Sequence, residues 1–542
     1  MRRAIVPALP WLAAWLLLVG LALGARPLTP VDETRYLAVA WEMWVSGDAL
    51  VPHLNGEPYS HKPPLLFWLI NLGWAVAGVS EWWARLVAPL CGLGALFAAR
   101  ALAAKLWPER PEISELVPWL LLGSLFWAAF ASLTMFDMLL TLISTVGLLA
   151  LVVAWRGRLV TGFAGLALAL GLGVLAKGPV IALYLLPPAL LAPWWASAQP
   201  PAQAVSWRRW YGGLALAVLV AAAAALAWAL PAARAGGPTY GDAILWGQTA
   251  GRMSQSFAHD RPFWWYLPLL PLLLFPWFFW PPLWRGAWRN RAGMWGETGP
   301  RLALATMVPA FVVFSLISGK QPHYMLPLFP PLMLIAARAL PQIPEGRWSL
   351  LPPALIVLLA GLALVLFGGL GQGPPEGHPG SLPSWLGAAE PLGFAMILLG
   401  ALVAVWRGPG LAGRVRTLAL QTLALVLLVH ATLVPALRPA FDLQRAAAHV
   451  GEILARGHAV AVVNKYQGQL QFPGRLRRAL EVVPGRQLES WLAAHPDGHV
   501  VTLHLKNLPQ SAGLPLYVQP YRGRQLAIWT RDNVLAEPLA FY

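Results

Sequence analysis

The most regular feature of the chain is a succession of apolar runs, each near the length that crosses a membrane. They recur through the first 434 residues and are separated by short polar or charged loops. About 20 apolar residues in a helix are needed to span the hydrocarbon core of a bilayer. The pattern predicts about thirteen transmembrane helices, near residues 5–25, 82–104, 114–134, 137–154, 160–176, 179–195, 211–231, 263–284, 302–319, 323–341, 350–371, 386–406 and 415–434.

One further apolar run, residues 65–79, is short and follows Pro63 and Pro64. We predict that it is an interfacial or re-entrant helix within the first loop, residues 26–81. With the N-terminus inside, every inside loop is then basic, as the positive-inside rule requires. Counting 65–79 as a full span would move the basic loops at Arg156 and Arg208 to the outside.

After about residue 435 the pattern changes. Residues 442–456 place apolar side chains on one helical face, and short β-rich runs follow at 459–463, 499–505 and 524–530. We predict a transmembrane catalytic domain over 1–434 and a small α/β domain over 435–542. The parity of the spans puts this second domain on the extracytoplasmic side.

Composition supports the membrane assignment. The chain is 58% hydrophobic and only 11% charged, whereas soluble domains carry roughly a quarter of charged residues. The formal charge of +16 comes mainly from short loops, so membrane topology explains it and nucleic acid is not an expected partner. Cys91 is the single cysteine, which excludes an internal disulfide and a cysteine cluster for metal.

The first loop is unusually polar for such a chain, and charged groups beside lipid indicate a functional site. Asp32 fits two interpretations: it caps a helix over 33–46 beside an exposed Glu33, or it takes a proton from an acceptor hydroxyl. Arg35 lies one turn later and is either the partner of an ion pair or a phosphate ligand. Lys62 precedes two prolines that open a helix, which favours a bound anion, although a lysine extending toward the interface also fits.

Three tight polar turns fall on the same predicted side of the membrane. They contain Asp137, Lys177 and the segment from Lys320 to Tyr324. Each alone is explained by a hairpin cap, but together they predict a cationic rim around one outward cavity. His61 and His259 either bind a divalent metal together or are ordinary interfacial histidines.

Several familiar signatures are absent from the sequence. It contains no GxxxxGK[ST] loop, no HExxH, no CxxC and no convincing GxGxxG. ATP-driven transport, zinc proteolysis and dinucleotide redox chemistry therefore lose support. No Asp-x-Asp signature is present either, so a lipid-linked sugar donor is favoured over a metal-held nucleotide donor.

The first loop resembles that of the bacterial aminoarabinose transferases that modify lipid A, within the protein mannosyltransferase-like family of integral membrane (GT-C) glycosyltransferases. The resemblance covers roughly residues 1–345 and is most specific in the first loop. The first-loop residues that carry it are Asp32 to Tyr36, Glu42-Met43, Gly47-Asp48, Pro52 to Gly56, Tyr59, Lys62 to Leu65 and Phe67-Trp68. Similar segments follow in the same order at Phe136-Asp137, Ala176 to Pro179, Pro262 to Pro268 and Lys320 to Pro327.

This resemblance implies a GT-C fold and a sugar donor carried on polyprenyl (undecaprenyl) phosphate. It implies transfer on the extracytoplasmic face, with inversion, to a lipid A-like glycolipid, a glycan or a protein. Asp32 would be the catalytic carboxylate, and Arg35, Lys62 and Tyr324 would bind the lipid phosphate. The family usually has an acidic residue where His61 stands, and the motifs do not specify the donor sugar or the acceptor.

We therefore predict a bacterial inner-membrane glycosyltransferase. The candidate catalytic residues are Asp32, Glu33 and Asp137. The candidate donor-phosphate ligands are Arg35, Lys62, Lys177, Lys320 and Tyr324. Two alternatives stay open on sequence alone: a transporter or flippase of a lipid-linked sugar, and a non-catalytic assembly protein that uses its tail for docking.

Overall fold

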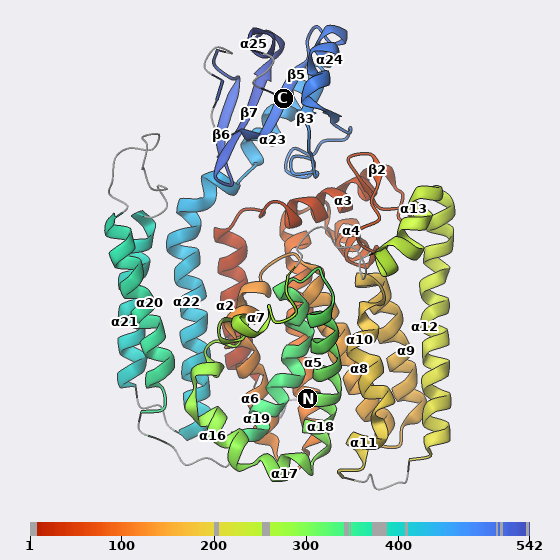
Figure 1. The fold of residues 1–542 in the computed structure, drawn as a ribbon, viewed down its shortest axis with the longest axis vertical. Helices are drawn as coiled ribbons and strands as arrows, with labels where there is room; N and C mark the ends of the chain where they lie inside the picture. The colour runs from red at the N-terminus through yellow and green to blue at the C-terminus, as the bar shows by residue number, and fades with distance from the viewer. Residues whose placement is uncertain are drawn as a thin grey trace. The chain divides into compact units, whose positions relative to one another are not determined.

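The computed structural model describes residues 8–199, 205–251, 261–340, 346, 348–370, 387–406, 410–505, 508–509, 513–537 and 541 (Figure 1). Most of the described chain is helical, and the strands lie mainly in its last hundred residues. The chain divides into two compact units. The first contains residues 1–24, 60–66 and 81–433, and the second contains 25–59, 67–80 and 434–542.

The first unit is a bundle of apolar helices. Seven helical segments of the described chain are long and apolar enough to cross a membrane, and α2 and α21 are slightly shorter. Its main helices are α2 (Leu9–Ala25), α5 (Glu81–Leu106), α6 (Pro111–Leu122), α7 (Leu125–Phe130), α8 (Phe136–Trp155), α9 (Leu159–Lys177), α10 (Ile181–Leu190), α11 (Ala192–Ala196), α12 (Trp207–Ala235), α13 (Pro238–Asp242), α15 (Leu270–Leu273), α16 (Pro281–Arg289), α17 (Arg291–Trp295), α18 (Thr298–Leu316), α19 (Phe329–Ala339), α20 (Leu351–Leu370), α21 (Ala389–Val405) and α22 (Gly410–Phe441).

Short 3₁₀ segments and a π-helix connect several of these helices. They are η2 (Gly178–Val180), η3 (Ala243–Gly251, the π-helix), η4 (Leu267–Leu269), η5 (Trp277–Phe279) and η6 (Pro322–Leu328). Within the bundle α8 packs between α5 and α9, and α9 packs against α12 (Figure 1). The helices predicted at 82–104, 137–154, 160–176 and 211–231 are confirmed as α5, α8, α9 and α12.

Four of the predicted spans are not continuous α-helices: 179–195 is divided into α10 and α11, 323–341 begins as the 3₁₀ segment η6, and two further runs are broken more severely. The run at 114–134 is divided into α6 and α7 at Gly123 and Ser124. The run at 263–284 consists of η4, α15, η5 and the start of α16, because its five prolines interrupt the helical hydrogen bonds. The two irregular stretches meet, since the backbone N–H of Leu125 donates to the carbonyl of Phe275 at 2.9 Å. Tertiary contacts thus satisfy backbone groups that an unbroken helix would satisfy itself.

The second unit combines segments of the first loop with the C-terminal part of the chain. Its first-loop elements are α3 (Asp32–Ser46), the two-stranded ribbon β1 (His53–Leu54) and β2 (Glu57–Pro58), and most of α4 (Leu65–Ala77). Its C-terminal elements are α23 (Gln444–Ala455), β3 (Val460–Val463), β4 (Glu481–Val483), η8 (Gly485–Gln487), α24 (Leu488–Ala494), β5 (His499–Leu505), β6 (Tyr517–Tyr521), β7 (Arg524–Thr530) and α25 (Arg531–Ala536).

The C-terminal sheet has the strand order β4-β3-β5-β7-β6. Strand β3 is parallel to both β4 and β5, whereas β7 is antiparallel to β5 and β6. The helix predicted at 442–456 and the strands predicted at 459–463, 499–505 and 524–530 are confirmed. Strands β4 and β6 were not predicted, because β4 has only three residues and β6 contains the proline Pro520.

The two faces of this sheet have separate apolar cores. One face buries Val450 and Ile453 of α23 against Val462, Val501 and Ile528. The other buries Trp491, Trp529 and Phe541. The first loop joins the same unit, because the indole N–H of Trp41 donates to the carbonyl of Leu476 at 2.8 Å. The C-terminal segment therefore supports the helix that carries Asp32.

Candidate active site

The most deeply buried carboxylate among the predicted site residues is Asp137, in the first turn of α8. Its residue is 2% exposed, and Lys177, the last residue of α9, donates to its Oδ1 atom at 2.5 Å. Because α8 and α9 form an antiparallel hairpin, the start of one helix lies beside the end of the other. Gly178 ends α9 with a φ of +77°, a conformation that favours glycine.

Other predicted residues gather around this ion pair. The Lys177 ammonium lies 4.8 Å from the centre of the Tyr324 ring, and the Lys62 ammonium lies 5.7 Å from the ring of Phe136. Lys62 and His323 both interact electrostatically with the Asp137 carboxylate. The structure thus brings Asp137, Lys177, Lys62 and Tyr324 into one group, which we call the Asp137 cluster. The cluster therefore combines one buried carboxylate with two ammonium groups.

The turn that holds Tyr324 is fixed by two tyrosine hydroxyls. Tyr184 of α10 donates to the Tyr324 carbonyl at 2.8 Å, and Tyr266 donates to the carbonyl of Gln321 at 3.0 Å. Sequence reasoning missed Tyr184. The one available signal was a single hydroxyl-bearing side chain in the otherwise apolar α10.

Lys320 has a different environment from the other predicted lysines. It is 2% exposed, and its ammonium donates to the carbonyl of Ile317 and, at 2.8 Å, to that of Arg261. These bonds place the charge against the backbone of the turn. Its geometry suits a brace for the turn better than a ligand for phosphate.

In the second unit, Asp32 is the first residue of α3. The residue before the helix is Val31, and no side chain caps the helix, so the capping interpretation of Asp32 is wrong. Instead, Arg35 donates to the Asp32 carboxylate, as the ion-pair interpretation stated. The Asp32 side chain remains 48% exposed, which leaves a carboxylate accessible to a ligand.

Arg35 is held from two further directions. Its Nη1 donates to the amide oxygen of Gln467 at 3.3 Å. Burial lowers the pKa of Arg35, but Tyr59, Asp32 and Tyr36 raise it, and the net effect is a raised pKa. The guanidinium is therefore a permanent positive charge next to an accessible carboxylate, in a planar form that suits a phosphate.

Glu33 is buried, at 2% exposure, whereas the capping interpretation left it exposed. Its carboxylate accepts from both terminal nitrogens of Arg26, with Nη2 to Oε1 at 3.0 Å. It also accepts from the backbone N–H of Thr29 at 2.9 Å. These bonds close the loop that leads into α3 and so hold the neighbouring Asp32 in place.

Of the two histidines predicted to bind a metal, the structure describes only His61. His61 belongs to the first unit, whereas His259 lies outside the described residues. Within the described ranges, no group of three or more His, Cys, Asp or Glu side chains is arranged to hold a metal ion. The predicted residues thus form two sets: Asp137, Lys177, Lys62 and Tyr324 in the first unit, and Asp32, Glu33 and Arg35 in the second.

A bundle of apolar helices with carboxylates and cations at the helix ends is typical of a polytopic membrane protein. Two crystal structures share the fold over nearly the whole chain. ArnT from Cupriavidus metallidurans in the apo state matches with a TM-score of 0.73 and 20% identity, covering 99% of each chain. The same protein bound to undecaprenyl phosphate matches with a TM-score of 0.71 and 20% identity, covering 97% of this chain and 98% of that one.

Sequence comparison names the relatives. Residues 61–228 match the family described as dolichyl-phosphate-mannose-protein mannosyltransferase. The undecaprenyl phosphate-alpha-4-amino-4-deoxy-L-arabinose arabinosyl transferase 2 of Pseudomonas fluorescens is 33% identical over 67% of this chain and 65% of its own length. The corresponding transferase of Edwardsiella ictaluri is 32% identical over 63% of this chain and 60% of its own length.

These matches confirm the resemblance that the first-loop residues indicated. The chain has the GT-C fold and is similar to the ArnT transferases and, over residues 61–228, to the protein mannosyltransferase family. The matched segment spans less than two thirds of the length of these two transferases.

Proposed function

We propose that this chain transfers a glycosyl group from a polyprenyl-phosphate-linked sugar to an acceptor. The observation that carries the proposal is the Asp137 cluster, where two lysine ammonium groups act on one buried carboxylate beside the Tyr324 ring. The names of the relatives support it, as does the fold shared with a protein crystallised with undecaprenyl phosphate. Among the candidate acids, the accessible Asp32 is the best placed to meet an acceptor.

The mechanism that we propose is a single displacement. The acceptor oxygen attacks the anomeric carbon of the donor while the bond from that carbon to the phosphate oxygen breaks, so the sugar configuration inverts. Asp32 takes the proton of the acceptor hydroxyl. Lys62, Lys177 and Tyr324 of the first unit bind the departing phosphate and stabilise the negative charge that develops on it. Arg35 of the second unit is a further proposed phosphate ligand, held beside Asp32. Glu33 acts through its bonds to Arg26, as a positioning residue for Asp32.

We propose a topology to accompany this chemistry. Thirteen spans with the N-terminus inside place basic loops inside and the site on the extracytoplasmic face of a bacterial inner membrane. The domain division at residues 1–434 and 435–542, with the second domain outside, belongs to the same proposal. The seven long apolar helices of the described chain support a polytopic protein. The number of thirteen transmembrane helices stays a prediction.

For the substrates, we propose undecaprenyl phosphate as the donor carrier and a lipid A-like glycolipid as the acceptor. The relatives' names support a polyprenyl carrier and an aminoarabinose donor. A glycan or a protein remains an alternative acceptor, because His61 replaces the acidic residue usual in the family. A divalent metal at His61 and His259 stays a separate prediction.

Transfer by purified protein in vesicles, with polyprenyl-phosphate sugar and lipid A as substrates, tests the proposal. We expect Asp32→Asn and Lys62→Ala each to lower turnover about 10²–10³-fold, the usual effect of removing a preorganised charge contact. Glu57→Gln and Lys105→Ala change exposed residues of the same charges and should leave turnover unchanged. Normal turnover of Asp32→Asn would overturn the proposal.

The same assay separates an enzyme from a flippase. A transferase releases free polyprenyl phosphate and adds one sugar to the acceptor, which mass spectrometry detects. A flippase moves the lipid-linked sugar without cleaving it. Movement of intact donor with no release of polyprenyl phosphate would therefore contradict the proposal.

A further inference from the structure

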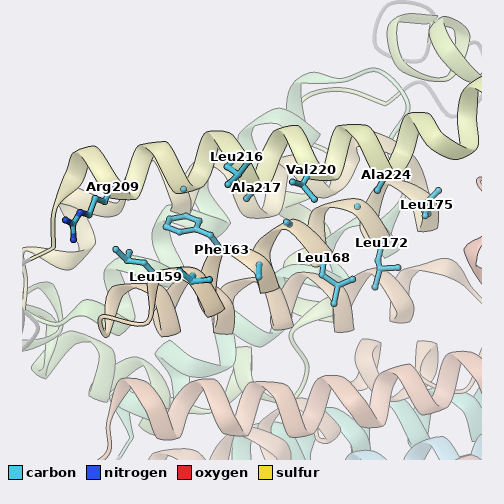
Figure 2. A pocket seen from close by; sticks show the side chains of 15 residues that line it. Leu159, Phe163, Leu168, Leu172, Leu175, Arg209, Leu216, Ala217, Val220 and Ala224 are labelled. Carbon is cyan, nitrogen blue, oxygen red and sulfur yellow. The ribbon is translucent and has the colours of Figure 1, made fainter.

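A long apolar groove runs along the surface of the first unit between α9 and α12 (Figure 2). Its volume is about 670 Å³. Phe163 lies at its floor and is 6% exposed, whereas Leu168 and Leu216 on its walls are each 62% exposed. The groove is therefore open along its length, on a face whose side chains suit contact with hydrocarbon.

Close contact between the two helices forms the groove. They run parallel, because Gly213 of α12 lies against Phe163 of α9, and Gly171 lies eight residues further along α9 against Ala221. A Cβ atom on Gly213 would lie 2.4 Å from the Phe163 ring, so glycine is needed for this approach. Gly171 and small alanines continue the depression between the helices.

The groove has a charged end and an uncharged end. Arg209 is the one charged residue among the fifteen described residues that line the groove. It lies beside Leu159, at the end formed by the N-termini of both helices (Figure 2). The opposite end is lined by Leu175 and Ala224. A ligand that matches this pattern has an anionic head and a long apolar tail.

We propose that this groove binds one acyl chain of an anionic glycerophospholipid, with its phosphate at Arg209. The site goes beyond the proposed glycosyl transfer and does not depend on it. Arginine is suited to a lipid phosphate, because its planar fork donates two parallel hydrogen bonds to the phosphate oxygens. The exposed walls let the lipid enter sideways from the bilayer.

The length of the groove and the thickness of one leaflet determine where the acyl chain ends. Along α9 the groove extends from Leu159 to Leu175, about 24 Å at 1.5 Å per residue. One leaflet of hydrocarbon is only about 15 Å thick, half of the usual core. An acyl chain that starts at Arg209 therefore passes Phe163 and Ala164 and stops before Ala224, which lies about 22 Å from Arg209 along α12.

The charge pattern distinguishes this lipid from the sugar donor. The phosphate ligand proposed on α9 is Lys177, two residues beyond Leu175, at the far end of the helix from Arg209. A polyprenyl chain whose phosphate lies at Lys177 would enter the groove from the uncharged end. Arg209 would then face the tail of the chain rather than its phosphate, which leaves the cation unexplained.

Native mass spectrometry of the full chain, titrated with phosphatidylglycerol or phosphatidylcholine, tests the proposal. We expect phosphatidylglycerol to bind more tightly, and Arg209→Gln to weaken that binding about three- to tenfold. Arg208→Gln is the matched control, because Arg208 is an exposed neighbour that does not line the groove.

A second pair of variants tests the position of the acyl chain. Ala164→Trp, which fills the groove near Arg209, should abolish this binding, whereas Ala224→Trp at the far end should not. Gel filtration and thermal unfolding confirm that each variant is folded.

Three results would overturn the proposal. Equal effects of Arg208→Gln and Arg209→Gln would mean attraction by general surface charge. Unchanged binding in Arg209→Gln would remove the proposed head-group contact. Loss of binding in Ala224→Trp but not in Ala164→Trp, with competition by undecaprenyl phosphate, would mean that a prenyl chain fills the groove from the other end.

Discussion

The ion pair of Asp137 and Lys177 removes two charged groups of the candidate site from water. Both side chains are buried, at 2% and 9% exposure. Burying two charges is expensive, and their attraction returns that energy only when geometry and further contacts are good. The nearby Lys62 and Tyr324 supply such contacts. A buried ion pair often adds little to the net free energy of folding. A functional role therefore explains this pair better than stability does.

A double-variant cycle on this pair separates structure from function. Lys177→Met leaves the Asp137 carboxylate buried without its closest partner, and we expect a loss of about 3–5 kcal/mol in the free energy of unfolding. Adding Asp137→Leu removes the remaining charge and should recover most of that loss. Thermal unfolding in detergent measures both. Recovery of transfer activity together with stability would contradict a functional role for the pair.

Sequence reasoning identified these residues but not their geometry. Asp137 and Lys177 were recognised because charges at tight turns between apolar runs are unusual. Their ion pair was not predicted; it forms because the hairpin places the start of α8 beside the end of α9. Tyr184 was missed because hydroxyl contacts with a distant turn leave no local pattern. The capping interpretation left Glu33 exposed because its partner, Arg26, precedes the helix and reaches it through a folded loop.

At the scale of elements, hydrophobic length predicted helix positions well and helix continuity poorly. Helices α8, α9 and α12 follow the apolar runs closely, because a span must satisfy its own backbone bonds. The runs at 114–134 and 263–284 break where they meet. The indole of Trp277 donates to Ser124 at 3.0 Å and to the carbonyl of Leu120 at 2.9 Å. Local hydrophobicity does not predict these hydrogen bonds, in which each broken segment satisfies polar groups of the other.

The break between α6 and α7 depends on Gly123. A Cβ atom there would lie 2.6 Å from the ring of Trp277 and 2.8 Å from the Cα of Ala419. Because backbone cannot move aside easily, we expect Gly123→Ala to cost about 1–3 kcal/mol in the free energy of unfolding. In α2, Gly20→Ala is the control, since a Cβ atom there meets nothing within 4 Å. Equal unfolding midpoints for the two variants would show that this contact is unimportant.

A buried ion pair joins α18 to α19 and carries a pH dependence. Arg338 donates from Nε to Glu297 Oε2 at 2.7 Å, and Trp107 donates to the same oxygen at 2.8 Å. Burial raises the pKa of Glu297, but the bonds from Arg338 and Trp107 outweigh it, so the net pKa is lowered. The folded state is therefore favoured above the unfolded pKa, about 4.3 for Glu. This advantage is lost as pH falls through the lowered folded pKa.

We expect Glu297→Gln to lower the thermal midpoint most at neutral pH. The difference from the parent protein should shrink as the pH falls below about 4, because both proteins then carry a neutral side chain at this position. Unfolding in detergent between pH 3 and 7.5 measures the difference. Glu112→Gln changes an exposed carboxylate and serves as the control. A difference that is independent of pH would mean that the charge of Glu297 does not contribute.

At the scale of the whole molecule, the first loop and the C-terminal segment are parts of one folded unit although about 400 residues separate them. The side chain of Asn55 donates to the carbonyl of Leu480 and accepts from its N–H, both at 2.8 Å. Trp74 stacks on Phe472 with ring centres 5.4 Å apart. A change in composition near residue 435 indicated the C-terminal elements, but pairing across such a distance has no signal in a single sequence.

This shared unit implies that the C-terminal segment acts by holding α3, and so Asp32 and Arg35, in place. Asn55→Ala removes both bonds to Leu480 without touching either charged residue. We expect faster hydrogen exchange in 32–46 and a loss of about 1–3 kcal/mol in local stability, since the backbone groups of Leu480 lose their partners. Because Asp32 would then be less well positioned, transfer turnover should fall while donor binding at the Asp137 cluster changes little.

His53→Ala alters a half-exposed neighbour in the same ribbon and is the control. Unchanged exchange in Asn55→Ala would contradict the support of α3, and normal turnover despite faster exchange would show that the order of this helix does not limit catalysis.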